Sequence, residues 1–282
     1  GIRGNLSVGF RRRHVKYISK NCQSIPEMLL FLAIFFYAIV FIVITLLKHW
    51  SFCSTYYDLG CFEQSLWTTL HGHFFWSSIQ NSSQFGVHNS PILFLLVPVY
   101  MVFPHSETLL ILQTLLLAGA AYPCYLIGKN LLNQWGGLTF ALLYLLYPAL
   151  HGVNLFDFHE LAFLPLTLFF AIYFLFEKRI FAFIIVSSIA LMIKEDVALI
   201  IFMLTLFSLI KHNYKSQKEM TALLLFLVFC VFWLIISVFI IIPHFNPYGY
   251  GHIARYSFEN GMVGVIQHEL WLKIVYLFLL FA

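Results

Sequence analysis

The sequence predicts an all-helical, multi-pass membrane protein. Of its 282 residues, 61% are hydrophobic and only 10% are charged, whereas about a quarter of the residues of a soluble domain carry a charge. The first apolar run, residues 29–47, has nineteen residues, with Thr45 as its one clearly polar side chain. Because such a run spans a hydrocarbon core about 30 Å thick, we expect a retained anchor rather than a cleaved signal peptide.

Later apolar runs predict a transmembrane helical bundle with about seven complete spans and a truncated last one. These runs cover residues 91–103, 107–128, 136–150, 161–176, 180–193, 197–210, 221–242 and 270–282. They do not alternate apolar with polar residues, which argues against a β-barrel. We expect a basic cytoplasmic segment at 1–28 and a transmembrane domain at 29–282 that continues in a longer protein.

The run 91–103 decides the predicted topology, because its thirteen residues make a helix only about 20 Å long. If it stays in the outer interface and the N-terminus is cytoplasmic, twelve Lys and Arg residues fall inside and four outside; if it crosses, the split is nine to seven. The positive-inside rule favours the first arrangement. We therefore expect a plasma-membrane protein with a cytoplasmic N-terminus and nine of its twelve acidic residues on the outer side.

Two short apolar runs, 180–193 and 197–210, flank the charged sequence Lys194-Glu195-Asp196. A hairpin keeps the basic residues at both far ends on one side of the membrane, so we favour it over one continuous helix. The turn of this hairpin then lies below the outer membrane surface, where three charged side chains need partners or a water-filled pocket. The alternative is a salt-bridged turn with only a structural role.

The loop after the first run contains Asp58, followed by apolar residues at 59, 62, 66, 67 and 70. This spacing predicts a helix that lies in the outer interface. Asp58 directly precedes the helix, so it is either a helix N-cap or a functional acid.

Two further polar clusters lie on the predicted outer side. His88 and Ser90 precede Pro91 in the sequence GVHNSP, which also suits an ordinary turn before a helix. Asp157, His159 and Glu160 fall in the sequence NLFDFHEL. Because phenylalanines flank the aspartate and the histidine, we expect a partly buried setting, which favours function over a plain loop.

The loop 243–269 contains Arg255 and many Gly, Tyr and His residues, which suit either a mobile lid or a plain connection. Cys53 and Cys61 share one outer loop and form either a disulfide or two free thiols. No metal-ligand spacing is diagnostic, so we predict no cofactor, without excluding a divalent metal. The net charge of +4 follows membrane topology and does not indicate a nucleic-acid partner.

Four short stretches together resemble known membrane proteins: Y-D-L-G at 57–60, H-x-S-P at 88–91, D-F-H at 157–159 and K-E-D at 194–196. The set resembles a bacterial and archaeal membrane-protein family of unknown function. More broadly, the arrangement resembles the GT-C superfamily, polytopic glycosyltransferases that use polyprenyl-phosphate-linked sugars. The resemblance covers the chain from about Asp58 to Glu269.

The resemblance implies a GT-C-like fold with Asp58 and Asp157 as catalytic acids. We expect Asp58 to accept the proton of the acceptor hydroxyl, while a cation stabilises the leaving phosphate. The candidate substrate-binding residues are His88, Ser90, His159, Glu160, Lys194, Glu195, Asp196 and Arg255.

The sequence thus favours a membrane glycosyltransferase that acts on the extracytoplasmic face, with a polyprenyl-phosphate sugar donor and membrane lipids as partners. A proton-coupled transporter is one alternative, suggested by the intramembrane charges at 194–196. The other is a non-catalytic assembly or lipid-binding subunit that keeps the fold.

Overall fold

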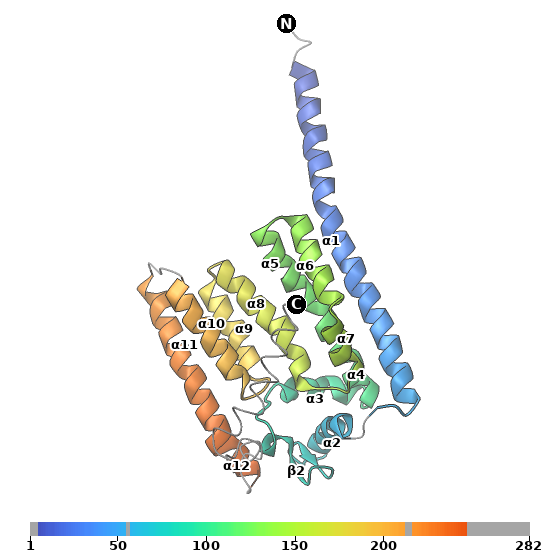
Figure 1. Cartoon of the computed structure of the whole chain (residues 1–282), viewed down its shortest axis with the longest axis vertical. Helices are drawn as coiled ribbons and strands as arrows, with labels where there is room; N and C mark the ends of the chain where they lie inside the picture. Colours follow the sequence, from blue (N-terminus) through green and yellow to red (C-terminus); the bar gives the residue numbers. More distant parts are fainter. Residues whose placement is uncertain (1–4, 55–56, 212–215, 247–282) are drawn as a thin grey trace, which may run out of the picture.

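The computed structural model describes residues 5–54, 57–211 and 216–246, which are almost entirely helical (Figure 1). Helix α1 (Asn5–Trp50) has 46 residues and is about 69 Å long at 1.5 Å per residue. Its N-terminal half extends beyond the other helices in Figure 1, while its C-terminal half packs against α4, α6 and α7.

A cap of short elements follows α1, and we use the term cap for residues 58–86. Its elements are α2 (Asp58–Leu70), β1 (Trp76–Ser77), β2 (Ser82–Ser83) and the 3₁₀ turn η1 (Gln84–Gly86). The two strands pair antiparallel. Helix α2 buries Leu59, Phe62 and Leu66, so the interfacial helix predicted from apolar spacing is confirmed as a helix. Cys53 and Cys61 are free thiols, and the disulfide alternative is therefore wrong.

The middle of the chain forms α3 (Leu93–Val102), α4 (Ser106–Gly119), α5 (Ala121–Leu131), α6 (Gln134–Leu145) and α7 (Pro148–Leu155). Helices α5 and α6 form a close hairpin because Gly128 and Gly137 face each other: a Cβ on Gly137 would lie 2.7 Å from the carbonyl oxygen of Tyr125. Helices α6 and α7 meet at an angle of 48°, and Pro148 begins α7, where its missing N–H costs no helical hydrogen bond.

The last described part contains the 3₁₀ turn η2 (Glu160–Phe163), α8 (Leu164–Phe176), α9 (Ile180–Leu191), α10 (Val197–Lys211), α11 (Gln217–Ile236) and α12 (Ile242–Phe245). Helices α8 to α11 share a core that includes Phe183, Ile201 and Leu223. The turn at 192–196 separates α9 from α10, and the two helices pack against each other. The hairpin predicted for 180–210 is therefore confirmed.

A π-helical turn, η3 (Ser237–Ile241), joins α11 to α12. The hydroxyl of Ser237 donates to the carbonyl of Trp233 at 2.6 Å and accepts a hydrogen bond from the Asn89 amide at 2.7 Å. Side chains that insert into a helix commonly accompany such a turn. Beyond it, the ring of Phe245 stacks on Phe74 of the cap with centroids 5.1 Å apart.

Three described helices are long and apolar enough to cross a membrane: Ile25–Trp50, Ser106–Leu131 and Gln217–Phe245; the bent pair α6–α7 would add a fourth. Helix α3 has ten residues and is about 15 Å long, half of a hydrocarbon core about 30 Å thick. Helices α9 and α10 have twelve and fifteen residues, or about 18 and 23 Å. The seven-span count and the GT-C-like arrangement therefore stay predictions.

Candidate functional site

Asp58 is the first residue of α2, and it faces a histidine from a distant part of the chain. The N-cap position belongs to Tyr57, and no side chain caps the helix, so the capping alternative is wrong. The Asp58 carboxylate lies 3.8 Å from Nε2 of His159, with the two side chains 30% and 35% exposed. This part-exposed pair brings together Asp58 of the stretch 57–60 and His159 of the stretch 157–159.

His159 is held in place by the backbone and by aromatic rings. Its backbone N–H donates to the side-chain oxygen of Gln113 at 3.0 Å. Its ring atom Nδ1 lies 3.2 Å from the backbone carbonyl oxygen of Asp157. The ring also contacts Phe62 and Phe156, with centroids 5.9 and 5.4 Å away. The ring can donate to that carbonyl when Nδ1 carries a hydrogen, and it can donate to the Asp58 carboxylate only when Nε2 carries one.

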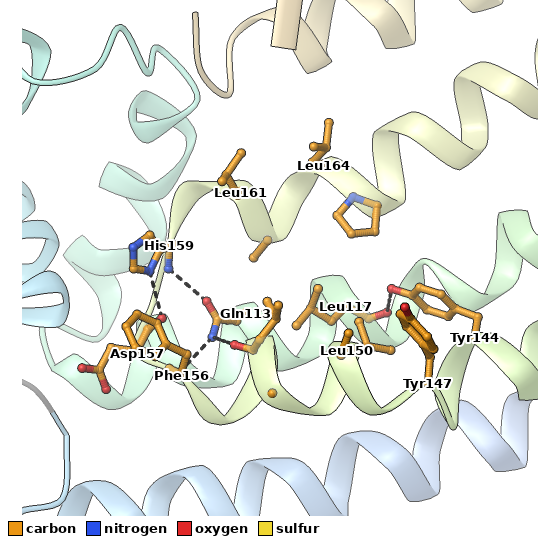
Figure 2. Close-up of a pocket in the computed structure, with 15 residues that line it drawn as sticks. Gln113, Leu117, Tyr144, Tyr147, Leu150, Phe156, Asp157, His159, Leu161 and Leu164 are labelled. Atoms are coloured by element: carbon orange, nitrogen blue, oxygen red, sulfur yellow. Dashed lines mark hydrogen bonds between the residues drawn. The ribbon is translucent and has the colours of Figure 1, made fainter. Parts of the chain in front are cut away.

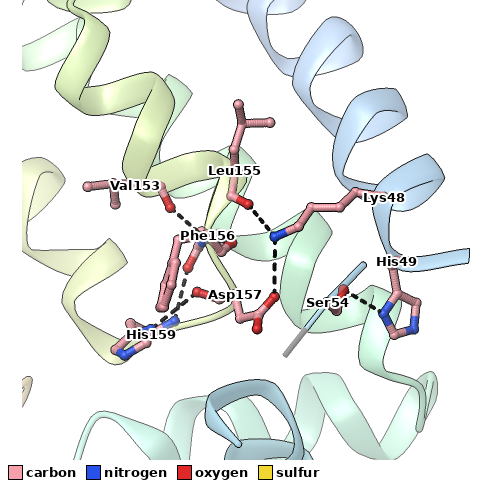
Figure 3. Close-up of polar contacts among 9 residues, drawn as sticks. Lys48, His49, Ser54, Val153, Leu155, Phe156, Asp157 and His159 are labelled. Atoms are coloured by element: carbon pink, nitrogen blue, oxygen red, sulfur yellow. Dashed lines mark hydrogen bonds and ion pairs between the residues drawn. The ribbon is translucent and has the colours of Figure 1, made fainter. Parts of the chain in front are cut away.

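Asp157 points away from this imidazole, towards α1 (Figure 3). Its side chain is 2% exposed, and its carboxylate lies 3.7 Å from the Nζ of Lys48. The same Nζ donates to the carbonyl of Leu155 at 2.8 Å. Sequence reasoning gave Lys48 no role at the site, because a lysine at the end of a span is usually explained by its position at the interface. We call Asp58–His159 and Lys48–Asp157 the surface pairs.

An open groove of about 570 Å³ has Asp157 and His159 of the surface pairs in its lining and runs between α4, α6, α7 and α8. Its apolar wall includes Leu117, Leu150, Val153, Leu161, Ala162 and Leu164. Figure 2 shows Asp157 and His159 at one end of the groove and Tyr144 and Tyr147 at the other. The groove therefore offers an apolar lining for a chain-like molecule, with polar groups at its head.

A second set of polar side chains lies inside the protein, and we call His88, Asn89, Glu195 and Ser237 the inner network. Glu195 is 1% exposed. One of its carboxylate oxygens lies 2.8 Å from Nδ1 of His88, and the other accepts the backbone N–H of Asn89 at 3.0 Å. This contact joins the H-x-S-P stretch to the K-E-D turn, while the neighbouring Asp196 is exposed.

Glu160 lies between the surface pairs and the inner network. Its side chain is 1% exposed, and burial raises the pKa of its carboxyl above the ordinary value of 4.5, although His88, Lys194 and His159 are close enough to oppose that shift. Burial thus favours the protonated acid. Three buried oxygens in this region have no hydrogen-bond partner among the described residues: Oδ1 of Asn89, Oγ of Ser90 and Oε2 of Glu160.

The structure thus brings most of the predicted site residues into two neighbouring sets. Asp58, Asp157 and His159 belong to the surface pairs, whereas His88 and Glu195 belong to the inner network. Ser90, Glu160 and Lys194 lie near that network, and Arg255 falls outside the described residues. Among the described residues, no group of three or more His, Cys, Asp or Glu side chains is arranged to hold a metal ion.

The two sets differ in the chemistry that they allow. The surface pairs combine a part-exposed acid, an imidazole and an ammonium at the head of an apolar groove, so they can exchange protons with a bound molecule. The inner network is buried and hydrogen-bonded, which suits it to hold the α9–α10 turn against residues 88–90.

Comparison with known proteins identifies the family of the chain. A family model described as "Predicted membrane protein (DUF2079)" matches residues 48–282. No curated protein and no solved structure matches the chain. The model covers most of the chain and confirms the resemblance to a membrane-protein family of unknown function. The chain therefore belongs to the DUF2079 family of membrane proteins.

Proposed function

We propose that this protein is a membrane glycosyltransferase of the GT-C type. It transfers a sugar from a polyprenyl-phosphate donor to an acceptor on the extracytoplasmic face of the plasma membrane, with its N-terminus in the cytoplasm. One observation carries the proposal: His159 of the part-exposed Asp58–His159 pair lines one end of an open apolar groove. That arrangement supplies a base at the place where a lipid-linked sugar would present its anomeric carbon.

Asp58 serves as the general base in this proposal. The acceptor hydroxyl attacks the anomeric carbon, its proton passes to the Asp58 carboxylate, and the bond to the lipid phosphate breaks with its electron pair leaving on the phosphate oxygen. His159, 3.8 Å from Asp58, orients the carboxylate and takes part in proton exchange. Asp157 is almost fully buried, which favours a supporting role through Lys48 over direct contact with the sugar.

The groove accommodates the isoprenoid chain of the donor. Its wall is aliphatic over most of its length, and burying an apolar chain contributes roughly 25 cal/mol for each Å² removed from water. In this proposal the open groove admits the chain from the bilayer.

The test measures donor consumption by the full-length protein in lipid vesicles. A panel of polyprenyl-phosphate sugars with radiolabelled sugar is added with a membrane extract as the acceptor source, and label leaving the lipid phase is followed. Wild-type protein should consume one donor, and Asp58→Asn should slow consumption about 100- to 10,000-fold. Wild-type protein that consumes none of the panel, or an Asp58→Asn variant as fast as wild type, would contradict the proposal.

Glu63→Gln is the matched control. Glu63 lies on the same helix as Asp58, but its carboxylate accepts hydrogen bonds from Tyr100, at 3.4 Å, and from Ser106. This variant should keep wild-type donor consumption, which separates the loss of the Asp58 carboxylate from a general change in α2.

Proton-coupled transport is a second candidate, supported by the burial of Glu160 and Glu195, since ionisable groups inside membrane proteins often mark ion pathways. Single cysteines at positions 194, 195 and 196 of the protein in oriented vesicles would distinguish the two functions. A transporter opens these positions to water-soluble thiol reagents from both sides in turn. A glycosyltransferase leaves them closed to reagents on the cytoplasmic side.

A further inference from the structure

Lys48 places a positive charge beside Asp157, a residue at one end of the groove. It lies in the last turn of α1, and its Nζ contacts both the carbonyl of Leu155 and the carboxylate of Asp157, which lines the groove. Only one residue separates Asp157 from His159, the partner of Asp58. Lys48 therefore belongs to the same small region as the proposed base, although it lies more than a hundred residues away in sequence from His159.

The geometry of Lys48 differs from that of a lysine that only neutralises a buried acid. Its side chain is 31% exposed, against 2% for Asp157, and the ion pair at 3.7 Å is longer than a hydrogen bond. An ammonium group has three N–H donors, and Leu155 accepts one of them at 2.8 Å. Two donors thus remain for an anion that approaches from the groove head.

Lys194 is placed differently. It follows α9 in the turn before α10, and its charge acts on the buried Glu160. Glu160 does not line the groove, whereas Asp157, the partner of Lys48, does. Within the described part of the chain, this makes Lys48 the better-placed lysine for an anion whose apolar tail occupies the groove.

We propose that Lys48 binds the phosphate of the polyprenyl-phosphate donor, an inference that rests on the proposed function. As the bond between the anomeric carbon and the phosphate oxygen breaks, its electron pair moves onto the phosphate, and the Lys48 ammonium stabilises the growing negative charge. Asp157 holds the ammonium beside the end of the groove, so it acts through Lys48 as a positioning residue.

The experiment compares two lipids of equal chain length, a polyprenyl phosphate and the corresponding polyprenol. Their binding to the purified full-length protein is measured by native mass spectrometry. Wild-type protein should bind the phosphate about ten- to a hundredfold more tightly, the value of one charge-assisted hydrogen bond. Lys48→Met should lose this preference, and Lys48→Arg should keep it. Lys211→Met, a control at the exposed end of α10, should keep it as well.

The outcomes separate the two proposals. Wild-type protein that binds neither lipid overturns the proposed function, whereas a Lys48→Met variant that retains the phosphate preference overturns the role of Lys48 alone. If Lys48→Met fails to fold because Asp157 loses the Lys48 ammonium, the double variant Lys48→Met/Asp157→Asn removes both charges. It should fold and bind both lipids equally, and a retained preference in this variant contradicts the inference.

Discussion

The surface pairs and the inner network use the same kinds of side chain with different geometry. In the surface pair, Asp58 and His159 lie 3.8 Å apart and are both about one-third exposed. In the inner network, Glu195 and His88 are 2.8 Å apart, and the carboxylate is almost fully buried. A long, hydrated pair adds little stability and leaves its groups available for chemistry, whereas a short, buried pair is costly to break. The difference in geometry suits the surface pairs to chemistry and the inner network to structural support.

The largest expected effect comes from breaking the inner network. Glu195→Ala removes the acceptor of both the His88 ring and the Asn89 N–H, so we expect the free energy of unfolding to fall by about 3–5 kcal/mol. Denaturant unfolding of the purified protein in detergent, followed by circular dichroism, measures this loss. Asp196→Ala, at the adjacent exposed position, should stay within about 0.5 kcal/mol of wild type. Equal effects of the two changes would refute the distinction.

Asn89→Ala tests whether the inner network is cooperative. The change removes the hydrogen bond to Ser237 and should cost about 1–3 kcal/mol of stability. Ser237→Ala removes the same bond from the other side, so the double variant should lose less than the sum of the two single losses. Strictly additive losses in the same unfolding assay would show that the two side chains act independently.

Glu160→Gln changes how stability depends on pH. Burial raises the pKa of Glu160 above the ordinary 4.5, so the folded state prefers the protonated acid. This preference stabilises the protein below pH 4.5 and is lost as the pH rises towards the folded-state pKa. Glutamine cannot ionise, so the variant should gain stability relative to wild type as the pH rises from 4.5. Melting temperatures of both proteins at several pH values check this, and parallel profiles would contradict it.

Compared with the inner-network variants, a change in the Asp58–His159 pair should have the smallest effect on stability. Asp58→Asn should change the free energy of unfolding by less than about 1 kcal/mol, because the carboxylate is part-exposed and 3.8 Å from its partner. The same unfolding assay measures it. A loss as large as that of Glu195→Ala would show that Asp58 is a structural residue and would remove the contrast between the two sets.

Much of the local structure could be predicted from the sequence. Apolar spacing predicted α2, and the basic residues at both ends of 180–210 predicted the hairpin that the structure contains. The number of membrane-spanning helices was harder to predict, because α9 and α10 are apolar but short. Length and composition cannot decide whether such helices cross a membrane that locally thins around them.

The candidate site was predicted only in part. The sequence indicated which residue types are unusual for a membrane protein, but not which of them meet. His88 and Glu195 are 107 positions apart, and a contact at that separation depends on the packing of α9 and α10 beside residues 88–92. Lys48 was missed because nothing local distinguishes a lysine that ends a span from one that also pairs with a buried acid.

The π-helical turn at Ser237–Ile241 also sets the direction, around the helix axis, in which the side chains after it point. A π turn accommodates one residue more than an α-helical turn, and each residue of an α-helix rotates the next by about 100°. Without that extra residue, Phe245 would leave the stack that it forms with Phe74, and its carbonyl would leave the close approach to Gly86. The extra residue thus rotates the end of this long helix so that its side chains contact the cap.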